Sequence, residues 1–253
     1  MKMHFLSGGR VRMRKATFIP DANRSEMIEL PVGSALLRHA QGNVLFDTGC
    51  HPSVVDDAAA RWGGLAKIMT PIMPRDENVL TGLAAIGVQP SDIDVVVCSH
   101  LHPDHCGCNV FFKRATVIVQ ARDVAAARAP DAEKFGFLSV DWDVGLPLDE
   151  IEGERDLFGD GRIVLIPLPG HTPGSMGALV ALERDGQFLL AADTVTLRVS
   201  LDTGVHPRNV QDHDAQENSF SEIRRIEASG ATIICGHDDA QWQTLRKGAD
   251  AYE

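Results

Sequence analysis

The sequence has little of what marks several large classes of protein. It contains a single Tyr, and Phe, Trp and Tyr together make up 6 % of its 253 residues. No stretch approaches the roughly 18–20 consecutive apolar residues of a membrane-spanning helix, so we expect no membrane partner. Basic residues are outnumbered, with 24 Lys and Arg against 35 Asp and Glu and a formal net charge of −11. Because nucleic acids are bound mainly by clustered Lys and Arg, we expect no nucleic-acid partner either.

Cysteine is also scarce, and its spacing shows no pairing. Five Cys at low density form no disulfide framework, which is typical of a reducing compartment. Residues 1–15 include basic residues but no apolar run of signal-peptide length, so we expect a cytoplasmic protein. The hydrophobic share of 44 % and the charged share of 23 % are ordinary for a soluble globular protein.

Short apolar runs rich in β-branched residues recur along the chain, bounded by turn residues, and a few helical patterns lie between them. Two sheets with helices outside would bury this many short strands. The predicted strands are residues 34–38, 43–47, 93–99, 116–120, 163–167, 176–182, 188–193 and 231–235. The predicted helices are residues 76–86, 123–129 and 220–228.

The densest chemical signal follows the predicted strand 93–99. Three His and one Asp fall within six residues, at His100, His102, Asp104 and His105. Neutral imidazole and carboxylate are good ligands for Zn²⁺, and a divalent cation explains why such groups gather. His100 and His102 point the same way in extended backbone and can hold one ion. Asp104 and His105 lie where the chain must turn, and they can hold a second ion.

Further ligands are expected where other predicted strands end. His171 follows strand 163–167, Asp193 ends strand 188–193, and His237 follows strand 231–235. Functional residues collect where a strand gives way to a loop, although each of these three alone is more often structural. Together with the first cluster they make seven ligands, which is enough for two ions that share one carboxylate.

This ordered set resembles the full metal motif of the metallo-β-lactamase superfamily. The resemblance covers nearly the whole chain and includes Phe46-Asp47-Thr48-Gly49, which is similar to the early Asp motif of that superfamily. It implies an α/β fold, an αββα sandwich of two mixed β-sheets with outer helices, as a single domain over residues 1–253. Asp47 is then expected to orient a ligand loop or a His ring, and a turn-forming Asp is the alternative interpretation.

The resemblance also implies the ions and their roles. The cofactors are two divalent ions, with Zn²⁺ preferred and Fe, Mn or Co also compatible with nitrogen and oxygen ligands. A hydroxide that bridges the ions attacks the substrate, and Asp104 is the catalytic proton carrier. One ion is assigned to His100, His102 and His171, the other to Asp104, His105 and His237, and Asp193 bridges both.

Within the superfamily, the chain looks most like the N-acyl homoserine lactonases. Asp193 in place of Cys argues against most zinc β-lactamases, and His102 in place of Glu argues against flavodiiron oxygen reductases. The size, the ligand spacing and the closing Gly236-His237-Asp238 fit the lactonases. The resemblance implies a small-molecule substrate, an N-acyl homoserine lactone. Hydrolysis would open its lactone ring, a reaction that serves quorum quenching. A homodimer is a compatible assembly, because the family uses the segment equivalent to residues 62–74 in a dimer contact.

The substrate pocket is predicted from an apolar segment and from one departure. Residues 62–74 are either an ordinary buried loop or an apolar lid, and their pocket candidates are Trp62, Leu65, Met69 and Met73. The lactonases place a Tyr three residues after the bridging Asp, and here that position is Thr196. Water or a nearby side chain must then contact the lactone carbonyl. The candidates are Arg198, His206 and His213, of which His206 is kept as a pocket residue although an exposed loop residue is the alternative.

Two rival functions stay open from the sequence. The first is a related metallo-hydrolase whose substrate is another lactone, an ester, a β-lactam or a phosphotriester. The second is a metal-binding protein without turnover, such as a sensor or a scaffold. The intact set of seven ligands, with Asp104 present, argues against the second.

Overall fold

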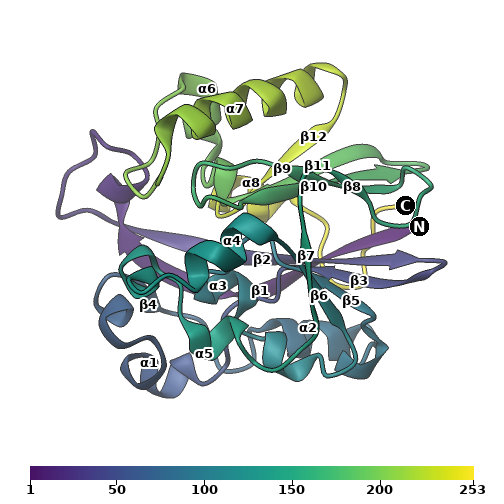
Figure 1. The fold of residues 1–253 in the computed structure, drawn as a ribbon, viewed down its shortest axis with the longest axis horizontal. Coiled ribbons are helices and arrows are strands. Elements are labelled where there is room, and N and C mark those ends of the chain that lie inside the picture. Colours follow the sequence, from purple (N-terminus) through teal and green to yellow (C-terminus); the bar gives the residue numbers. More distant parts are fainter.

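The computed structural model describes residues 1–253, and its strands form two sheets stacked face to face (Figure 1). The first sheet has the order β4-β1-β2-β3-β5-β6-β7 and the second the order β12-β11-β10-β9-β8. The first sheet contains β1 (Lys2–Arg14), β2 (Met27–His39), β3 (Gly42–Phe46), β4 (Thr70–Pro71), β5 (Val95–Val97), β6 (Thr116–Gln120) and β7 (Leu148–Ile151). The second contains β8 (Arg155–Asp156), β9 (Ile163–Pro167), β10 (Met176–Leu182), β11 (Gly186–Ala192) and β12 (Thr232–Cys235).

Helices cover the outer faces of both sheets. In Figure 1, α7 lies over the second sheet, and α2 and α5 lie over the outer face of the first. The helices are α1 (Val54–Trp62), α2 (Val79–Ala85), α3 (Pro103–Cys106), α4 (Ala121–Ala127), α5 (Ser139–Trp142), α6 (Arg198–Thr203), α7 (His213–Ala228) and α8 (Asp239–Thr244). None of them is long and apolar enough to cross a membrane.

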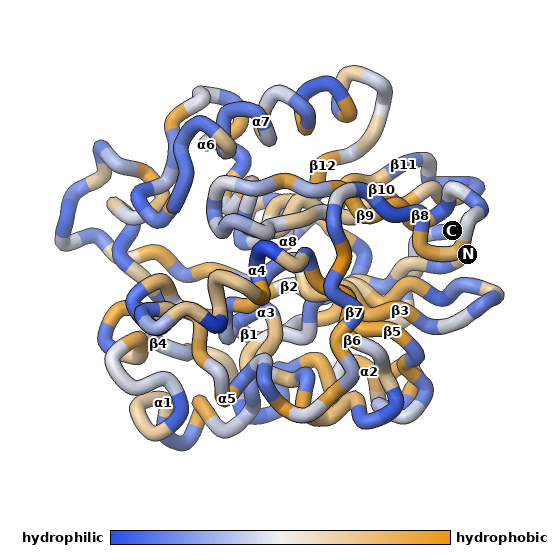
Figure 2. Tube along the Cα trace, in the orientation of Figure 1, coloured by the Kyte–Doolittle hydropathy of each residue, from blue (hydrophilic) through white to orange (hydrophobic).

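The layers follow from the period-two alternation of the strands. On β2, Leu37 faces the second sheet and joins the core between the sheets, while its neighbour Leu36 packs against the outer helices. On the second sheet, Leu189 packs under Phe220 of α7, and Leu190 faces the first sheet. Figure 2 shows hydrophobic positions concentrated along the strands. This is the predicted αββα sandwich of two mixed sheets with outer helices.

The predicted strands agree best where the apolar runs are uninterrupted. β6, β9 and β10 coincide with the predicted ranges 116–120, 163–167 and 176–182. β1 was not predicted, and β2 begins well before the predicted start at residue 34. In β1 the pair Gly8-Gly9 breaks the alternation, and the register against β2 shifts there as in a β-bulge.

The predicted helices are right in kind but not in length. α2 begins after Asn78, whose side-chain oxygen accepts hydrogen bonds from the backbone N–H groups of Leu80 and Thr81. α7 begins at His213, seven residues before the predicted start at 220. The first half of this helix is polar, so the apolar spacing used for the prediction does not reveal it. In the segment 62–74, Gly and Pro residues prevent a long helix as expected, and a short 3-10 helix (Gly63–Lys67) leads into β4.

The arrangement of strands brings several loops to one place. β3 and β5 run parallel, and so do β11 and β12, while β9 runs in the direction of β11 through the antiparallel β10. All the predicted metal ligands and Asp47 follow the carboxyl ends of five of these strands, namely β3, β5, β9, β11 and β12. The single Tyr lies elsewhere, because Tyr252 packs edge-on against Phe5 and Phe188.

Candidate metal centre

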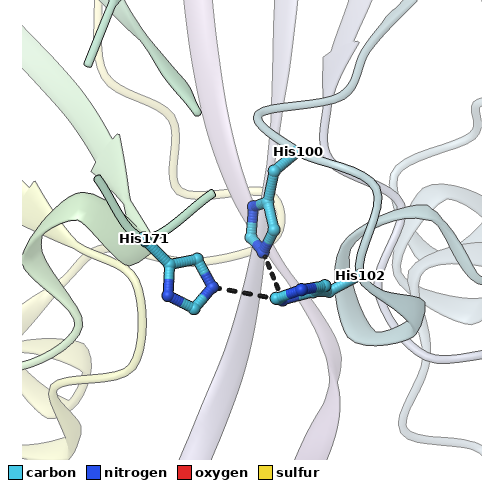
Figure 3. Close-up of side chains that lie close together, drawn as sticks. All are labelled: His100, His102 and His171. Atoms are coloured by element: carbon cyan, nitrogen blue, oxygen red, sulfur yellow. Dashed lines mark hydrogen bonds between the residues drawn. The ribbon is translucent and has the colours of Figure 1, made fainter. Parts of the chain in front are cut away.

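The first cluster of ligands consists of His100, His102 and His171, here called the three-His cluster. Figure 3 shows their rings turned toward one another from two separate loops. The Nδ1 atom of His102 lies 3.1 Å from Nε2 of His100 and 3.1 Å from Nε2 of His171. The far side of two rings is also fixed. His102 Nε2 donates to the Phe135 carbonyl at 2.8 Å, and His100 Nδ1 lies 3.0 Å from Ser99 Oγ.

The second cluster consists of Asp104, His105 and His237, here called the carboxylate cluster. The Nε2 atoms of His105 and His237 lie 3.3 Å apart. Asp104 Oδ2 lies 3.8 Å from the first of these atoms and 3.6 Å from the second. The outer nitrogen of His237 donates to the Pro31 carbonyl at 2.7 Å, so the ring is held from behind.

Asp193 lies between the two clusters. Its Oδ1 atom is 2.9 Å from His237 Nε2 and 3.3 Å from His105 Nε2, while Oδ2 is 3.5 Å from His171 Nε2. The two oxygens of one carboxylate therefore face different clusters. Gly236 permits this approach, because a Cβ atom there would lie 2.5 Å from Asp193 Oδ1.

The residues present fit two divalent cations. Buried imidazole nitrogens face one another at about hydrogen-bond distance, and the buried Asp193 Oδ1 makes no hydrogen bond. Burial lowers the pKa of His171 to about 3 and that of His100 well below its ordinary value, so both rings are neutral and free to ligate. Burial also acts to lower the pKa of His105, but the carboxylates of Asp104 and Asp193 raise it well above its usual range. A metal cation beside His105 would balance the negative charge of the Asp104 and Asp193 carboxylates in place of a proton on the ring.

Asp47 supports the carboxylate cluster from behind. Its Oδ2 accepts hydrogen bonds from His105 Nδ1 and from Ser99 Oγ, both at 2.8 Å, and its Oδ1 accepts from the Ser99 backbone N–H at 2.7 Å. Asp47 reaches them from the turn after β3, where its φ is 58°, an uncommon conformation for a residue other than Gly. This is the contact with a His ring that the sequence interpretation expects of Asp47.

The sequence interpretation missed Asp123. This residue is fully buried in the first turn of α4, and its carboxylate accepts hydrogen bonds from the backbone N–H groups of Leu101 and Gly174. Burial raises the pKa of Asp123 to about 6. No local signal could have found it, because an Asp at the start of a short helix is common for its favourable interaction with the helix dipole.

A cavity of about 730 Å³ opens onto the ligands, a volume typical of small-molecule sites. One part of its lining is the set of metal-ligand candidates His102, Asp104, His171, Asp193 and His237. The facing part, here called the apolar wall, consists of Met13, Phe18, Leu30, Trp62, Leu65, Ile68, Met69 and Leu138. The polar rim includes Glu133, Lys134, Arg208, Asn209 and Gln211. The arrangement suits a ligand with a polar reacting group and an apolar tail.

Three of the six predicted pocket residues line the cavity, namely Trp62, Leu65 and Met69. Met73 does not, because it is buried in the cluster around β1 and packs over Gly9. Ile68 was missed although it is 57 % exposed at the cavity.

Thr196 and His206 also lie outside the cavity lining. Thr196 is 1 % exposed, and its hydroxyl donates to the Asp193 carbonyl at 3.1 Å. His206 is held by His213 at 3.0 Å and by Glu217 at 3.2 Å. The alternative candidate Arg198 is likewise paired, with Glu227 and Asp202. All three side chains therefore have other partners and lie outside the cavity lining.

Known proteins of similar sequence match most of this chain. The N-acyl homoserine lactonase AttM of Azorhizobium caulinodans is 29 % identical over 260 residues, which cover 100 % of this chain and 99 % of that protein. The N-acyl homoserine lactonase AiiB of Agrobacterium fabrum is 30 % identical, with 90 % of this chain and 87 % of that protein covered.

A solved structure supports the fold. An N-acyl homoserine lactone hydrolase with the product N-hexanoyl-L-homoserine bound at its catalytic metal centre superposes with a TM-score of 0.89 at 24 % identity, covering 99 % of this chain and 98 % of the other. The sequence profile of the metallo-beta-lactamase superfamily matches residues 28–237. The match includes strands of both sheets and all seven candidate ligands, and the chain belongs to the metallo-beta-lactamase superfamily.

Proposed function

We propose that this protein is a metal-dependent hydrolase that opens the lactone ring of N-acyl homoserine lactones. The observation that carries the proposal is the cavity, which joins a pair of ligand clusters to an apolar wall in one space. The names of the relatives AttM and AiiB support the same substrate class.

The proposed ligand sets are those of the two clusters. The three-His cluster would hold one ion and the carboxylate cluster the other, and Asp193 would offer one oxygen to each. Zn²⁺ is the proposed metal, because His and Asp in closely packed, neutral-imidazole sites suit it well. Such a pair of ions supplies a water nucleophile at neutral pH and polarises the substrate carbonyl.

The chain's own residues then direct the reaction. Water oxygen bonds to the lactone carbonyl carbon, the ring C–O bond breaks, and the ring oxygen must gain a proton. Asp104 lines the cavity, and its Oδ2 lies within 3.8 Å of both imidazole nitrogens of its cluster, so it is placed to carry the proton of water to the ring oxygen. The product is an N-acyl homoserine with one hydroxyl group and one carboxylate, and the second proton of water is released to solvent when the new carboxylic acid ionises.

The apolar wall gives the acyl chain a place. Trp62, Leu65 and Met69 face the cavity from α1 and the segment that follows it, and Met13, Phe18 and Leu30 face it from the β1–β2 hairpin. Burial of each additional methylene against such a surface stabilises binding by about 0.8 kcal/mol. Homoserine lactones with longer acyl chains are therefore expected to have lower KM values until the cavity is filled.

The test is a substrate panel with protein reconstituted with Zn²⁺. The panel contains acyl homoserine lactones of several chain lengths, an unsubstituted γ-butyrolactone, a chromogenic cephalosporin and a phosphotriester. We expect the highest kcat/KM for the acyl homoserine lactones and loss of turnover after chelation. Equal or faster turnover of another substrate class would withdraw the assignment, and fewer than two bound ions in an active protein would withdraw the dinuclear site.

A further inference from the structure

We propose that Asp123 is a positioning residue that holds the three-His cluster together. This inference rests on the proposed metal site and names a residue outside the ligand set. Asp123 is fully buried in α4. Its Oδ2 accepts a hydrogen bond from the Leu101 backbone N–H at 2.8 Å, and its Oδ1 accepts one from the Gly174 backbone N–H at 3.2 Å.

These two donors belong to the two loops that carry the three-His cluster. Leu101 stands between His100 and His102 in the loop after β5, and Gly174 follows His171 in the loop after β9. β5 is part of the first sheet and β9 part of the second. One carboxylate therefore links the two sheets at the point where their loops must set the distance between three ligand atoms.

Few other contacts make this link. The Met176 backbone N–H donates to the Ser99 carbonyl at 2.9 Å, which joins the bases of the same loops. Within the second loop, Ser175 Oγ accepts from the Thr172 backbone N–H at 3.0 Å, a bond that shapes the loop but does not reach across. Outside the ligand set, Asp123 is the one side chain that hydrogen-bonds both loops.

The fit between α4 and the second loop is close. A Cβ atom on Gly174 would lie 2.4 Å from the Asp123 backbone nitrogen, so the loop touches the helix only because residue 174 is Gly. Each oxygen of this buried carboxylate accepts one of the two hydrogen bonds. Replacement of one carboxylate oxygen by an amide nitrogen, as in Asn, leaves a buried N–H group without an acceptor and frees the loop to move.

The carboxylate cluster does not depend on this link. Its His105 ring is held by Asp47 and its His237 ring by the Pro31 carbonyl. Asp123 makes no hydrogen bond to either of these groups. A change at Asp123 is therefore expected to weaken one ion and to spare the other.

The experiment measures both Zn²⁺ affinities of the full-length protein by competition with a chromogenic chelator. In Asp123→Asn we expect one ion to bind about 10- to 100-fold more weakly, a loss typical of residues that orient metal ligands, and the other to change less than about twofold. If Asp123→Asn yields no folded protein, Asp123→Ser is measured in the same way.

A double-mutant cycle identifies the affected cluster. In a His171→Ala background, where the three-His cluster is already broken, Asp123→Asn is expected to cause no further loss of Zn²⁺ affinity. In a His237→Ala background its full effect is expected to persist. The opposite pattern, or equal weakening of both ions in the single variant, would overturn the inference.

A matched control separates positioning from general stability. Asp141 is also fully buried, but it pairs with Arg61 and makes no hydrogen bond to either of the two loops that Asp123 joins. Asp141→Asn is expected to lower the melting temperature of the metal-free protein and to leave both Zn²⁺ affinities within about twofold. If both variants weakened Zn²⁺ alike, Asp123 would be merely structural. A wild-type protein that binds fewer than two ions would instead refute the proposed site.

Discussion

The metal-ligand end of the cavity and its apolar wall are built in different ways. The seven candidate ligands follow the carboxyl ends of β5, β9, β11 and β12, of which β5, β9 and β11 lie inside the two sheets and β12 lies at the edge of the second. The apolar wall comes from the β1–β2 hairpin, from α1 and the 3-10 helix after it, and from the stretch before α5. The candidate ligands therefore all follow strand ends, whereas the wall is assembled from the turn-side ends of β1 and β2, from α1 and from the segments beside them.

This difference separates two requirements of the proposed reaction. Metal ligands must keep their distances within a few tenths of an ångström, which strand ends and buried carboxylates provide. An acyl chain needs only an apolar surface of about the right shape to bind. Loops and Met side chains provide such a surface and can adapt its shape to the chain. Changes at the ligand end are therefore expected to affect turnover for every substrate, and changes in the wall to affect chain-length preference.

The largest effect is expected from Asp193→Ala. The carboxylate of Asp193 faces both clusters, so its loss removes a ligand from each ion and leaves the remaining imidazoles less well placed. We expect fewer than two ions per chain and a fall in kcat/KM of about a thousandfold or more for all acyl chain lengths. Metal analysis and kinetics on the same sample provide the measurement. A variant that kept two ions and most of its activity would show that Asp193 is not the bridge.

The same contrast explains what the sequence could predict. The candidate ligands can be predicted from the sequence because His100-x-His102-x-Asp104-His105 is a local pattern and each of the other three lies at or just after the end of an apolar run. Asp47 was within reach for the same reason. The sandwich followed from strands such as β6, β9 and β10, whose apolar runs are unbroken.

The residues of the apolar wall and the contacts that support the ligands could not be predicted from the sequence, for physical reasons. The β1–β2 hairpin brings Met13, Phe18 and Leu30 to the cavity. The sequence does not reveal β1, because the bulge at Gly8-Gly9 interrupts its apolar alternation. Asp123 is defined by two backbone N–H groups from distant segments, which no sequence spacing encodes. Thr196 was placed by its distance along the chain from Asp193, but a 3-10 turn (Asp193–Val195) directs its side chain back into the protein.

The second-largest effect is expected from Trp62→Ala, a change in the apolar wall that lowers stability. Trp62 is 1 % exposed and is the largest side chain shared by the wall and the core cluster around β1 and β2. Truncation of such a residue is expected to lower the free energy of unfolding by about 3–5 kcal/mol. Chemical denaturation measures this loss, and metal analysis at low temperature is expected to find two ions still bound. Loss of metal from the folded variant would contradict the separation of wall and ligands.

Asp47→Asn tests the ligand end with a smaller change. The substitution removes the negative charge behind His105 and replaces an acceptor of its Nδ1–H, so the carboxylate cluster is expected to bind its ion about 10- to 100-fold more weakly. Competition with a chelator gives the affinity. Asp160→Asn is the matched control, because that Asp is exposed and pairs only with His39 among the side chains. An equal effect of the two variants would mean that charge in general, and not the Asp47 contact, sets the affinity.

The smallest effect is expected from Leu65→Ala, and it tests the wall most directly. Leu65 lines the cavity from the 3-10 helix after α1 and is only partly buried, so its truncation costs little stability. We expect KM to rise about fivefold for a dodecanoyl homoserine lactone, which corresponds to about 1 kcal/mol of lost apolar contact, and to change less than about twofold for the butanoyl compound.

The control for Leu65→Ala is Leu80→Ala, a partly buried residue of α2 that packs on the outer face of the first sheet and does not line the cavity. This variant is expected to leave the ratio of the two KM values at the wild-type level. If Leu65→Ala raised KM equally for both chain lengths, the acyl chain would not lie along the wall. A lower kcat with unchanged KM would place Leu65 with the ligand end instead, because the truncation would then act on the reacting group and not on the tail.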